Sequence, residues 1–310
     1  MERKTASDLP RHGYINRRSF LDGSGKLVVS GLAAGSLFGI ASPDDAWAWQ
    51  GPRESHPASA RVLEQLRTRF TFQMSVDVGG IEQGRVVAGA ALAGGVTIVE
   101  MGTPLLKNSG VSNVVPAFRK QFPEALLLAD MKTMDGGGFE ARGVYSGGGN
   151  IVDFLALAGV DTAKSICAVR DEFRRSGASL PRLAFADILV PHQGPAAQAG
   201  DVALRMIEAG VDGVGVHLQS DARRADPKLI ESDYLGDMAL AIFERVGKIA
   251  PVQVVGGLSI AQAQRLARAG LRAFVISGNL GLPDSVARYD LPPSEIQRHV
   301  AAFIAEVSGA

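Results

Sequence analysis

The sequence has little of what several common classes of protein require. Its 310 residues include one cysteine, Cys167, which excludes an intramolecular disulfide and a cysteine-rich metal site. Lysine plus arginine number 32, as do aspartate plus glutamate, so the net charge of zero gives no electrostatic reason to expect a nucleic-acid or anionic-membrane partner. Aromatic residues make up only 6%, while 37 residues are glycine, which favours helices packed closely on a sheet over an all-β sandwich.

Residues 1–48 differ in composition from the rest and are predicted to be an export leader. An arginine pair at 17–18 precedes Phe20-Leu21, an apolar run covers about 27–41, and the triplet 46–48 is Ala-Trp-Ala, which is the order of a signal peptide. The arginine pair followed by Phe-Leu resembles the twin-arginine (Tat) export signal, which a receptor reads. Roughly 15 apolar residues fall short of the ~20 that span a bilayer. We therefore expect a periplasmic or otherwise exported protein with no stable membrane anchor; a cytoplasmic protein with a leader is the alternative.

Downstream of the leader, the hydrophobic pattern predicts eight strand-then-helix units. Near-continuous apolar runs, typical of parallel strands buried on both faces, alternate with helical stretches. The predicted strands are Phe72–Val78, Val96–Met101, Ala125–Met131, Ile151–Ala156, Arg182–Ile188, Gly213–His217, Val252–Val255 and Ala273–Ile276. Eight units in about 240 residues are typical of an α/β protein with a (β/α)8 TIM barrel. The alternative, a doubly wound open sheet, would carry a glycine-rich fingerprint after its first strand, and Val78-Gly79-Gly80-Ile81 does not match it.

We place the barrel at 71–310 as a single domain. Residues 49–70 form an N-terminal extension, with a short helix expected from about Ser59 to Arg69.

Charged and polar side chains recur where the predicted strands end, which in a barrel is the mouth that carries the active site. They are Asp77, Glu100, Asp130, Lys132, Asp135, Asp187 and His217. A buried charge without a partner costs several kcal/mol. Charges that converge on one barrel mouth must therefore form pairs, bind a metal or serve the function.

Asp130 and Lys132 are two residues apart on the predicted third strand, so their side chains should share a face. An ammonium group between carboxylates stays protonated, and can stabilise a developing oxyanion or enolate and deliver a proton. Glu100 and Asp130, on adjacent strands, have the oxygen ligands that Mg²⁺ prefers. A salt-bridge network that closes the barrel mouth is the alternative interpretation.

Strands seven and eight are followed by Gly256-Gly257 and Ser277-Gly278. Glycine lets backbone N–H groups approach an anion, and the loops after these two strands are the usual phosphate site of a barrel. Plain turn chemistry is the alternative. Arg223 and Arg224, after strand six, are interpreted as part of a solvated loop, with contact to an anionic substrate as the alternative.

Two segments resemble a known family. Residues 99–105 are Val-Glu-Met-Gly-Thr-Pro-Leu, and residues 129–137 are Ala-Asp-Met-Lys-Thr-Met-Asp-Gly-Gly. They resemble 3-hexulose-6-phosphate synthase and 3-keto-L-gulonate-6-phosphate decarboxylase, two branches of the orotidine 5′-phosphate decarboxylase suprafamily, whose mark is Asp-x-Lys-x-x-Asp. The resemblance covers about residues 72–282, which is essentially the whole predicted barrel.

The resemblance implies a role for each of several residues. Glu100 and Asp130 would bind Mg²⁺, and Asp77 would hold substrate hydroxyls. Lys132 would stabilise an enediolate, and His217 would transfer a proton. The four residues that would cradle the phosphate of a sugar phosphate are Gly256, Gly257, Ser277 and Gly278.

The resemblance also implies a homodimer, in which Asp135 reaches into the active site of the partner subunit. The expected activity is that of a Mg²⁺-dependent lyase. The synthase deprotonates ribulose 5-phosphate to an enediolate and adds it to formaldehyde, whereas the decarboxylase forms its enediolate by losing CO₂. Ser220 stands where the decarboxylase has an arginine, which favours the synthase. Decarboxylation is the first alternative, and an exported barrel that binds a sugar without catalysis is the second.

Overall fold

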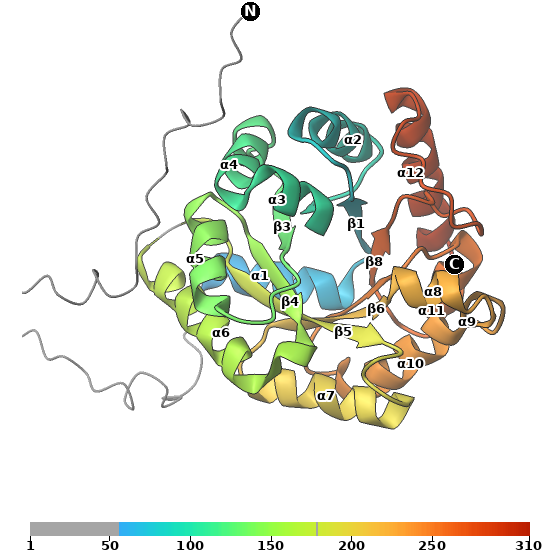
Figure 1. Cartoon of the computed structure of the whole chain (residues 1–310). Coiled ribbons are helices and arrows are strands. Elements are labelled where there is room, and N and C mark those ends of the chain that lie inside the picture. Colours follow the sequence, from blue (N-terminus) through green and yellow to red (C-terminus); the bar gives the residue numbers. More distant parts are fainter. Residues whose placement is uncertain (1–55, 178) are drawn as a thin grey trace, which may run out of the picture. The chain divides into compact units, whose positions relative to one another are not determined.

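Eight parallel strands close into a barrel, in the order β1 to β8, with helices around the outside (Figure 1). The computed structural model describes residues 56–177 and 179–310. The predicted (β/α)8 fold is therefore confirmed. The predicted leader, residues 1–48, lies outside the described residues.

The eight strands occur where the apolar runs predict them, with ends that differ by at most two residues. They are β1 (Thr71–Val76), β2 (Ile98–Met101), β3 (Leu126–Asp130), β4 (Ile151–Leu155), β5 (Leu183–Val190), β6 (Gly213–Leu218), β7 (Val252–Val255) and β8 (Ala273–Ile276). All residues of β1, β2, β5 and β8 are buried. This burial explains the continuous apolar runs, because helices cover the outer face of a parallel barrel.

Helices connect and cover the strands. They are α1 (Pro57–Thr68), α2 (Ile81–Ala93), α3 (Thr103–Ser109), α4 (Val111–Gln121), α5 (Gly137–Ser146), the 3-10 turn η3 (Ala156–Ala158), α6 (Gly159–Arg175), α7 (Ala196–Glu208), α8 (Ser220–Ala225), α9 (Lys228–Glu231), α10 (Tyr234–Val246), α11 (Ile260–Arg268) and α12 (Pro293–Ser308). Across the described ranges, none of them has both the length and the apolar composition that a membrane span needs.

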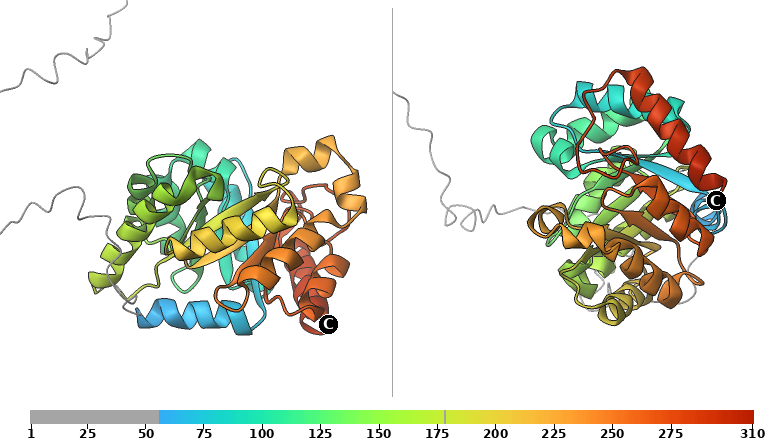
Figure 2. Two further views of the ribbon diagram at one scale, coloured as in Figure 1. Left: turned by 90° about the horizontal axis from the view of Figure 1, so that it is seen from below. Right: turned by 90° about the vertical axis from the view of Figure 1, so that its right-hand side faces the viewer.

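Helix α1 closes one end of the barrel, opposite the end where α8 and α9 lie (Figure 2). It begins at Pro57, and the His56 side chain accepts a hydrogen bond from the Ser59 N–H. Leu66 packs against an apolar cluster inside the barrel, and the Ser59 hydroxyl donates to the Arg182 carbonyl at 3.1 Å, just before β5. This helix lies within the extension where a short helix is predicted, and it seals the amino-terminal ends of the strands.

The barrel interior changes from apolar to charged along the strands. Side chains two residues apart on a strand share a face. The interior cluster next to α1 includes Ile98, Leu128, Ile151 and Phe185. Two residues further along the same strands are Glu100, Asp130, Asp153 and Asp187. An apolar floor thus supports a layer of carboxylates at the carboxyl-terminal mouth.

Candidate active site

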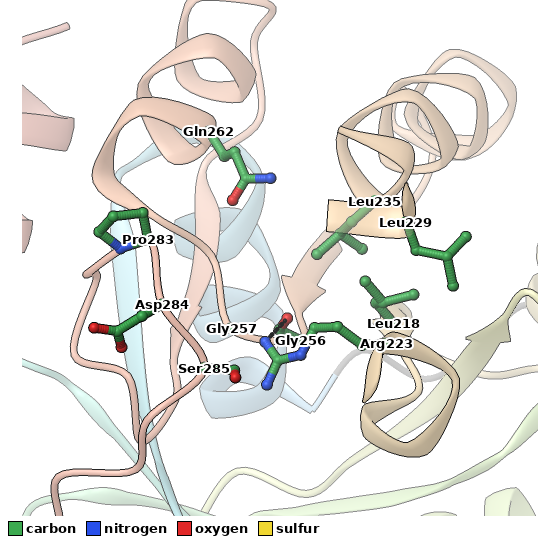
Figure 3. Close-up of a pocket in the computed structure, with 10 residues that line it drawn as sticks. All are labelled: Leu218, Arg223, Leu229, Leu235, Gly256, Gly257, Gln262, Pro283, Asp284 and Ser285. Atoms are coloured by element: carbon green, nitrogen blue, oxygen red, sulfur yellow. Dashed lines mark hydrogen bonds between the residues drawn. The ribbon is translucent and has the colours of Figure 1, made fainter. Parts of the chain in front are cut away.

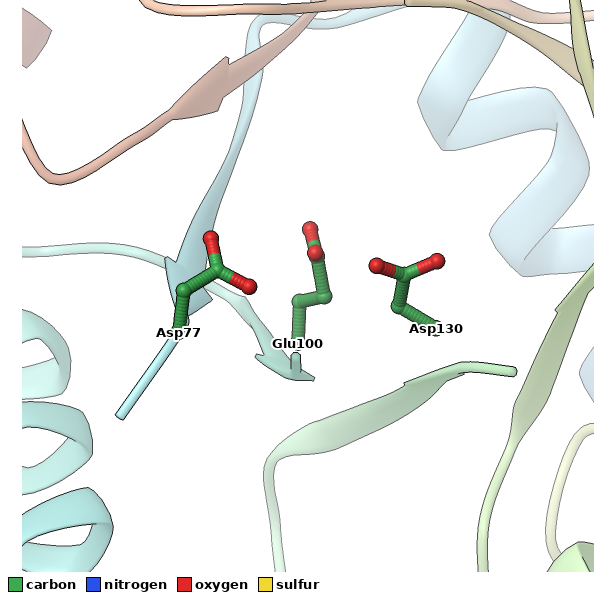
Figure 4. A group of neighbouring side chains, drawn as sticks. All are labelled: Asp77, Glu100 and Asp130. Carbon is green, nitrogen blue, oxygen red and sulfur yellow. The ribbon is translucent and has the colours of Figure 1, made fainter. Parts of the chain in front are cut away.

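Three carboxylates from neighbouring strands face one space at the barrel mouth (Figure 4). Asp77 follows β1, Glu100 lies in β2, and Asp130 ends β3. Each offers an oxygen atom, and these atoms all lie within 4.8 Å of one another. Three carboxylate oxygens this close together suit a hard divalent cation. The structure therefore brings together the two residues predicted to bind metal and adds Asp77 to them.

Buried amides fix the position of Glu100. The Gln253 side chain donates to Gln73 Oε1 at 2.6 Å, and Gln73 Nε2 donates to Glu100 Oε2 at 2.5 Å. Gln73, Gln253 and Glu100 are all at least 95% buried. Because each amide group is held by its neighbour, Glu100 is held in one orientation before any ligand binds.

Ser75 lies between two of the carboxylates. Its Oγ is 2.8 Å from Asp77 Oδ2 and 2.8 Å from Glu100 Oε1. A hydroxyl has one proton to donate, so it can satisfy only one of the two carboxylates at a time. Burial, and next Asp130, raise the pKa of Glu100 well above its usual range, and crowding of the Asp77 carboxylate by protein atoms, and next Asp130, raise the pKa of Asp77, although part of that residue remains exposed. A cation among these oxygens would relieve the repulsion.

Lys132 reaches the site from a turn after β3 and not, as the sequence predicts, from the strand itself. Strand β3 ends at Asp130, and Lys132 lies beyond it in the left-handed region, with φ of +47°. Its Nζ is nevertheless 2.7 Å from Asp130 Oδ1 and 3.4 Å from Asp187 Oδ2. The two side chains therefore meet through a turn rather than through a shared strand face. Non-glycine residues with such φ values are uncommon and often mark functional sites.

The surroundings of Lys132 keep it charged. Burial alone would lower the pKa of the ammonium group, but Asp187, Asp130 and Asp153 outweigh burial and raise it. The group is therefore a fixed cation and hydrogen-bond donor. It can stabilise negative charge that develops on a substrate oxygen.

Asp187 orients His217. His217 Nδ1 lies 2.7 Å from Asp187 Oδ2. Burial would raise the pKa of Asp187, but His217 and Lys132 more than offset this and hold it below the usual range. An ionised carboxylate can only accept, so Nδ1 donates to it, and in the neutral imidazole it is then Nε2 that carries the lone pair. His217 can therefore act as a base through Nε2.

Asp153 is a member of the site that the sequence analysis misses. It lies on β4, beside Asp130 in the strand register, and forms a second acidic group with Asp130 and Asp187. Its Oδ1 has no hydrogen-bond partner in the described residues, and burial, Asp187 and Asp130 raise its pKa well above the usual range. The available signal is its place two residues after Ile151, which matches the places of Glu100 and Asp130 on their strands.

The structure does not bring Asp135 to the other predicted residues. It lies in an exposed turn, where its carboxylate accepts a hydrogen bond from the Gly136 N–H at 2.7 Å. Two exposed apolar side chains stand near it in sequence, Met134 and Phe139, the latter 87% exposed. In a single chain, Asp135 thus belongs to a surface and not to the barrel mouth.

The two glycine loops differ in their surroundings. Gly256 and Gly257 line a pocket, whereas Ser277 and Gly278 are absent from its lining. Gly278 is buried, and a Cβ placed on it would come within 2.9 Å of the Tyr289 ring. The Tyr289 hydroxyl donates to the Ser75 carbonyl at 2.9 Å. The segment after β8 thus folds back over Gly278 and reaches the barrel mouth.

Comparison with known proteins gives a consistent assignment. A model of the orotidine 5′-phosphate decarboxylase / HUMPS family matches residues 71–233. The 3-hexulose-6-phosphate synthase of Mycobacterium gastri is 28% identical over 225 residues, which are 70% of this chain and 94% of that protein. A crystal structure of 3-hexulose-6-phosphate synthase matches with a TM-score of 0.61 at 24% identity, covering 75% of this chain and 99% of that one. The crystal structure of 3-keto-L-gulonate-6-phosphate decarboxylase from Vibrio cholerae has a TM-score of 0.56 at 18% identity, covering 77% of this chain and 98% of that one.

Asp77 depends on the absence of a side chain at Gly102. A Cβ there would strike Asp77 Oδ1 and lie 2.7 Å from the Val76 carbonyl oxygen. We therefore expect Gly102→Ala to move the Asp77 carboxylate and to lower the free energy of unfolding by about 1–3 kcal/mol. Chemical denaturation and a crystal structure of the variant measure the two effects. Gly80→Ala is the matched control, because nothing lies within 4 Å of its Cβ position. An unmoved Asp77 in the Gly102 variant would contradict the prediction.

Proposed function

The chain belongs to the orotidine 5′-phosphate decarboxylase / HUMPS family and is a carbon–carbon lyase, and we propose that it catalyses a 3-hexulose-6-phosphate synthase-type reaction. In this reaction an enediolate formed from ribulose 5-phosphate adds to formaldehyde. The observation that carries the proposal is the Lys132 ammonium, held between Asp130 and Asp187 beside the carboxylates of Asp77 and Glu100.

The proposed roles follow from the charges and from the hydrogen bonds. His217 Nε2 removes a proton from the carbon next to the substrate carbonyl, since its Nδ1 proton is committed to Asp187. The electron pair moves onto the carbonyl oxygen, where the Lys132 ammonium stabilises the negative charge. The enediolate carbon then forms a bond to the carbon of formaldehyde, the C=O π pair moves onto the formaldehyde oxygen, and the proton held by His217 passes to that alkoxide. Asp77, which is open to solvent, accepts hydrogen bonds from substrate hydroxyls.

Mg²⁺ is the cation that we propose for the acidic group. Asp77, Glu100 and Asp130 would hold it, because their oxygen atoms are close together and hard cations prefer oxygen ligands. When bound, the ion would supply positive charge next to the substrate oxygens. The raised pKa values of Asp77 and Glu100 support this assignment, because both partly reflect repulsion among carboxylates that a divalent cation would compensate.

Two observations favour the synthase reaction over decarboxylation. Ser220 occupies the position of the decarboxylase arginine and is exposed at the start of α8. Curated relatives that match more than half of this chain carry the synthase name. Decarboxylation of a keto acid phosphate is the second candidate, because both reactions use an enediolate and the same Lys132. A barrel that binds a sugar without turnover is the third.

The proposed reaction predicts formaldehyde consumption that depends on ribulose 5-phosphate and on Mg²⁺. Lys132→Ala should lower kcat/KM at least about 100-fold, because it removes the cation that stabilises the oxyanion. Lys164→Ala, on the exposed face of α6, is the control and should leave the rate unchanged. CO₂ release from 3-keto-L-gulonate 6-phosphate without formaldehyde consumption would contradict the synthase proposal and show that the chain is a decarboxylase. Sugar binding with neither turnover would refute both.

The proposed metal site predicts tight Mg²⁺ binding, measurable by calorimetry or by Mn²⁺ substitution and electron paramagnetic resonance. Glu100→Gln keeps the shape of the side chain but removes a charged ligand. Since even the outer partners of metal ligands are worth roughly 10- to 100-fold in affinity, it should weaken binding at least that much. Glu172→Gln, in an exposed pair with Arg142, is the matched control. Equal Mg²⁺ affinities in the two variants would show that the metal does not bind at this site.

We propose that the protein forms a homodimer in which Asp135 completes the site of the partner subunit. Asp135 is exposed, and Met134 and Phe139 place 54% and 87% exposed apolar side chains close to it in sequence. Large apolar side chains in the open favour a protein contact. A symmetric dimer uses the same surface on both subunits, so the Asp135 turn of each subunit would lie at the barrel mouth of the other.

The shared site can be tested by mixing two inactive variants. Lys132→Ala and Asp135→Ala should each be inactive alone. In a mixed dimer, one of the two sites then has both wild-type residues, so unfolding and refolding the mixture should restore about a quarter of the wild-type activity. Light scattering gives the mass of each species, and refolding each variant by itself is the control. Failure of the mixture to regain activity, with dimers present, would show that Asp135 serves its own subunit or none.

Export by the twin-arginine route is a further proposal, and it rests on the sequence of residues 1–48 alone. It bears on the substrate, because sugar phosphates are scarce outside the cytoplasm. Whether this chain recognises a phosphorylated sugar is therefore the central question about its substrate.

A further inference from the structure

A pocket lies at the carboxyl-terminal ends of β6 and β7, next to the proposed catalytic group (Figure 3). Its wall includes Leu218, the residue after His217, and both glycines that follow β7. The full lining is Leu218, Arg223, Leu229, Leu235, Gly256, Gly257, Gln262, Pro283, Asp284 and Ser285. Arg223 is the one cationic side chain in this lining, and it comes from α8, the short helix after β6.

The guanidinium group of Arg223 is incompletely satisfied. Its Nη1 donates to the Gly256 carbonyl at 2.9 Å, but its Nε is buried and has no hydrogen-bond partner among the described residues. No carboxylate in the described ranges forms an ion pair with it. Its neighbour Arg224, in contrast, pairs with Asp221 at 2.9 Å in the open. Burial, and next Arg224, lower the pKa of Arg223, as expected for a charge without a counter-ion.

The backbone of Gly257 packs closely against the Arg223 side chain. It has φ of +77°, and a Cβ at this position would collide with Arg223 Nη1. Its N–H makes no hydrogen bond within the described part of the chain, whereas its carbonyl accepts one from the Asn279 side chain at 2.9 Å. Asn279 also holds the Leu258 and Leu282 carbonyls. The loop is thus fixed from behind, with a free backbone donor beside a guanidinium group.

Two other polar side chains of the pocket, Asp284 and Gln262, already have partners. Asp284 forms two hydrogen bonds with Arg288, at 2.8 Å and 2.6 Å. The Gln262 amide donates to Asp233 and accepts from Ser259. The uncompensated charge in the described lining is therefore that of Arg223. A pocket with one free positive charge, a free N–H and apolar walls is suited to an anion at the end of a small molecule.

We propose that Arg223 is the residue that binds the phosphoryl group of the substrate, together with the backbone of Gly257. The phosphoryl oxygens would accept from the guanidinium group and from the Gly257 N–H, which together offer donors from two directions. The charge for phosphate recognition thus comes from the segment after β6, whereas the Tyr289 ring packs against Gly278 in the loop after β8. This inference gives the substrate of the proposed function a phosphorylated end, and it rests on that function for the identity of the sugar.

The test measures binding, so it does not require turnover. Inorganic phosphate, D-ribulose 5-phosphate and D-ribulose are titrated into the full chain by calorimetry. Arg223→Gln should weaken phosphate and ribulose 5-phosphate binding roughly 10- to 100-fold, because it removes a charge-assisted hydrogen bond. It should leave the affinity for ribulose unchanged. Arg224→Gln is the matched control, on the same helix and with the same loss of charge, and it should change phosphate affinity less than about twofold.

Two more variants keep the test decisive if Arg223→Gln folds poorly. Arg223→Lys keeps the charge without the fork and should bind phosphate with intermediate affinity. Gly257→Ala displaces the guanidinium from the opposite side and should weaken phosphate binding while Arg223 is still present. Circular dichroism verifies the fold of each variant.

The outcomes separate this inference from the proposed reaction. Equal phosphate affinity in wild type, Arg223→Gln and Arg224→Gln would overturn the inference, as would a wild type that binds no phosphate. Acetate binding that depends on Arg223 more strongly than phosphate binding does would make the pocket a carboxylate site and would also overturn it. Arg223-dependent phosphate binding without formaldehyde consumption would refute the synthase reaction but would support Arg223 as the residue that binds the phosphoryl group.

Discussion

Five carboxylates and one ammonium group share the mouth of this barrel, and this imbalance of charge governs the described site. Lys132 forms ion pairs with Asp130 and Asp187, but its single positive charge offsets only one of the five carboxylates. The remaining negative charge has to be met by protons or by a cation. Burial raises the pKa of Glu100 and the neighbouring carboxylates raise it further; the same crowding of acids favours a divalent ion and keeps Lys132 protonated. In the proposed reaction, the Lys132 ammonium group would be the positive charge that meets the enediolate.

Much of this arrangement can be predicted from the sequence, and the remainder shows what a linear pattern lacks. The strands are recognisable because both of their faces are buried, which gives apolar runs, and Glu100, Asp130 and His217 are recognisable because they end those runs. Asp153 escapes the same reasoning because two more apolar residues of its strand, Phe154 and Leu155, follow it. The alternation of Ile151 and Asp153 carries the signal, since the apolar residue faces the floor and the acid faces the mouth.

Other parts depend on contacts that no local pattern contains. From its left-handed turn, Lys132 reaches Asp187, which is 55 residues away in the sequence and close to it only in the closed barrel. Two glycine loops look alike in the sequence, but the fold covers Gly278 with Tyr289 and leaves Gly257 beside Arg223. Arg223 and Arg224 are adjacent, so the sequence assigns both to the same solvated loop. The short helix α8 instead turns one of them into a pocket and the other toward Asp221 and solvent.

The hydrogen bonds from Gln253 to Gln73 and from Gln73 to Glu100 donate in the same direction around the barrel wall. Glu100 can only accept when it is ionised, so Gln73 must present its NH₂ group to it and its carbonyl oxygen to Gln253. Gln253 is thereby obliged to donate as well, across β8, which lies between β7 and β1. The ionisation state of one acid on β2 thus sets the orientation of a side chain on β7. If Gln253 were replaced by an ionised glutamate, its carboxylate would face the Gln73 carbonyl oxygen. Two acceptors would then meet, and the hydrogen bond between these residues would be lost. Gln73 and Gln253 thus link the orientation of side chains on β1 and β7 to the charge of one acid on β2.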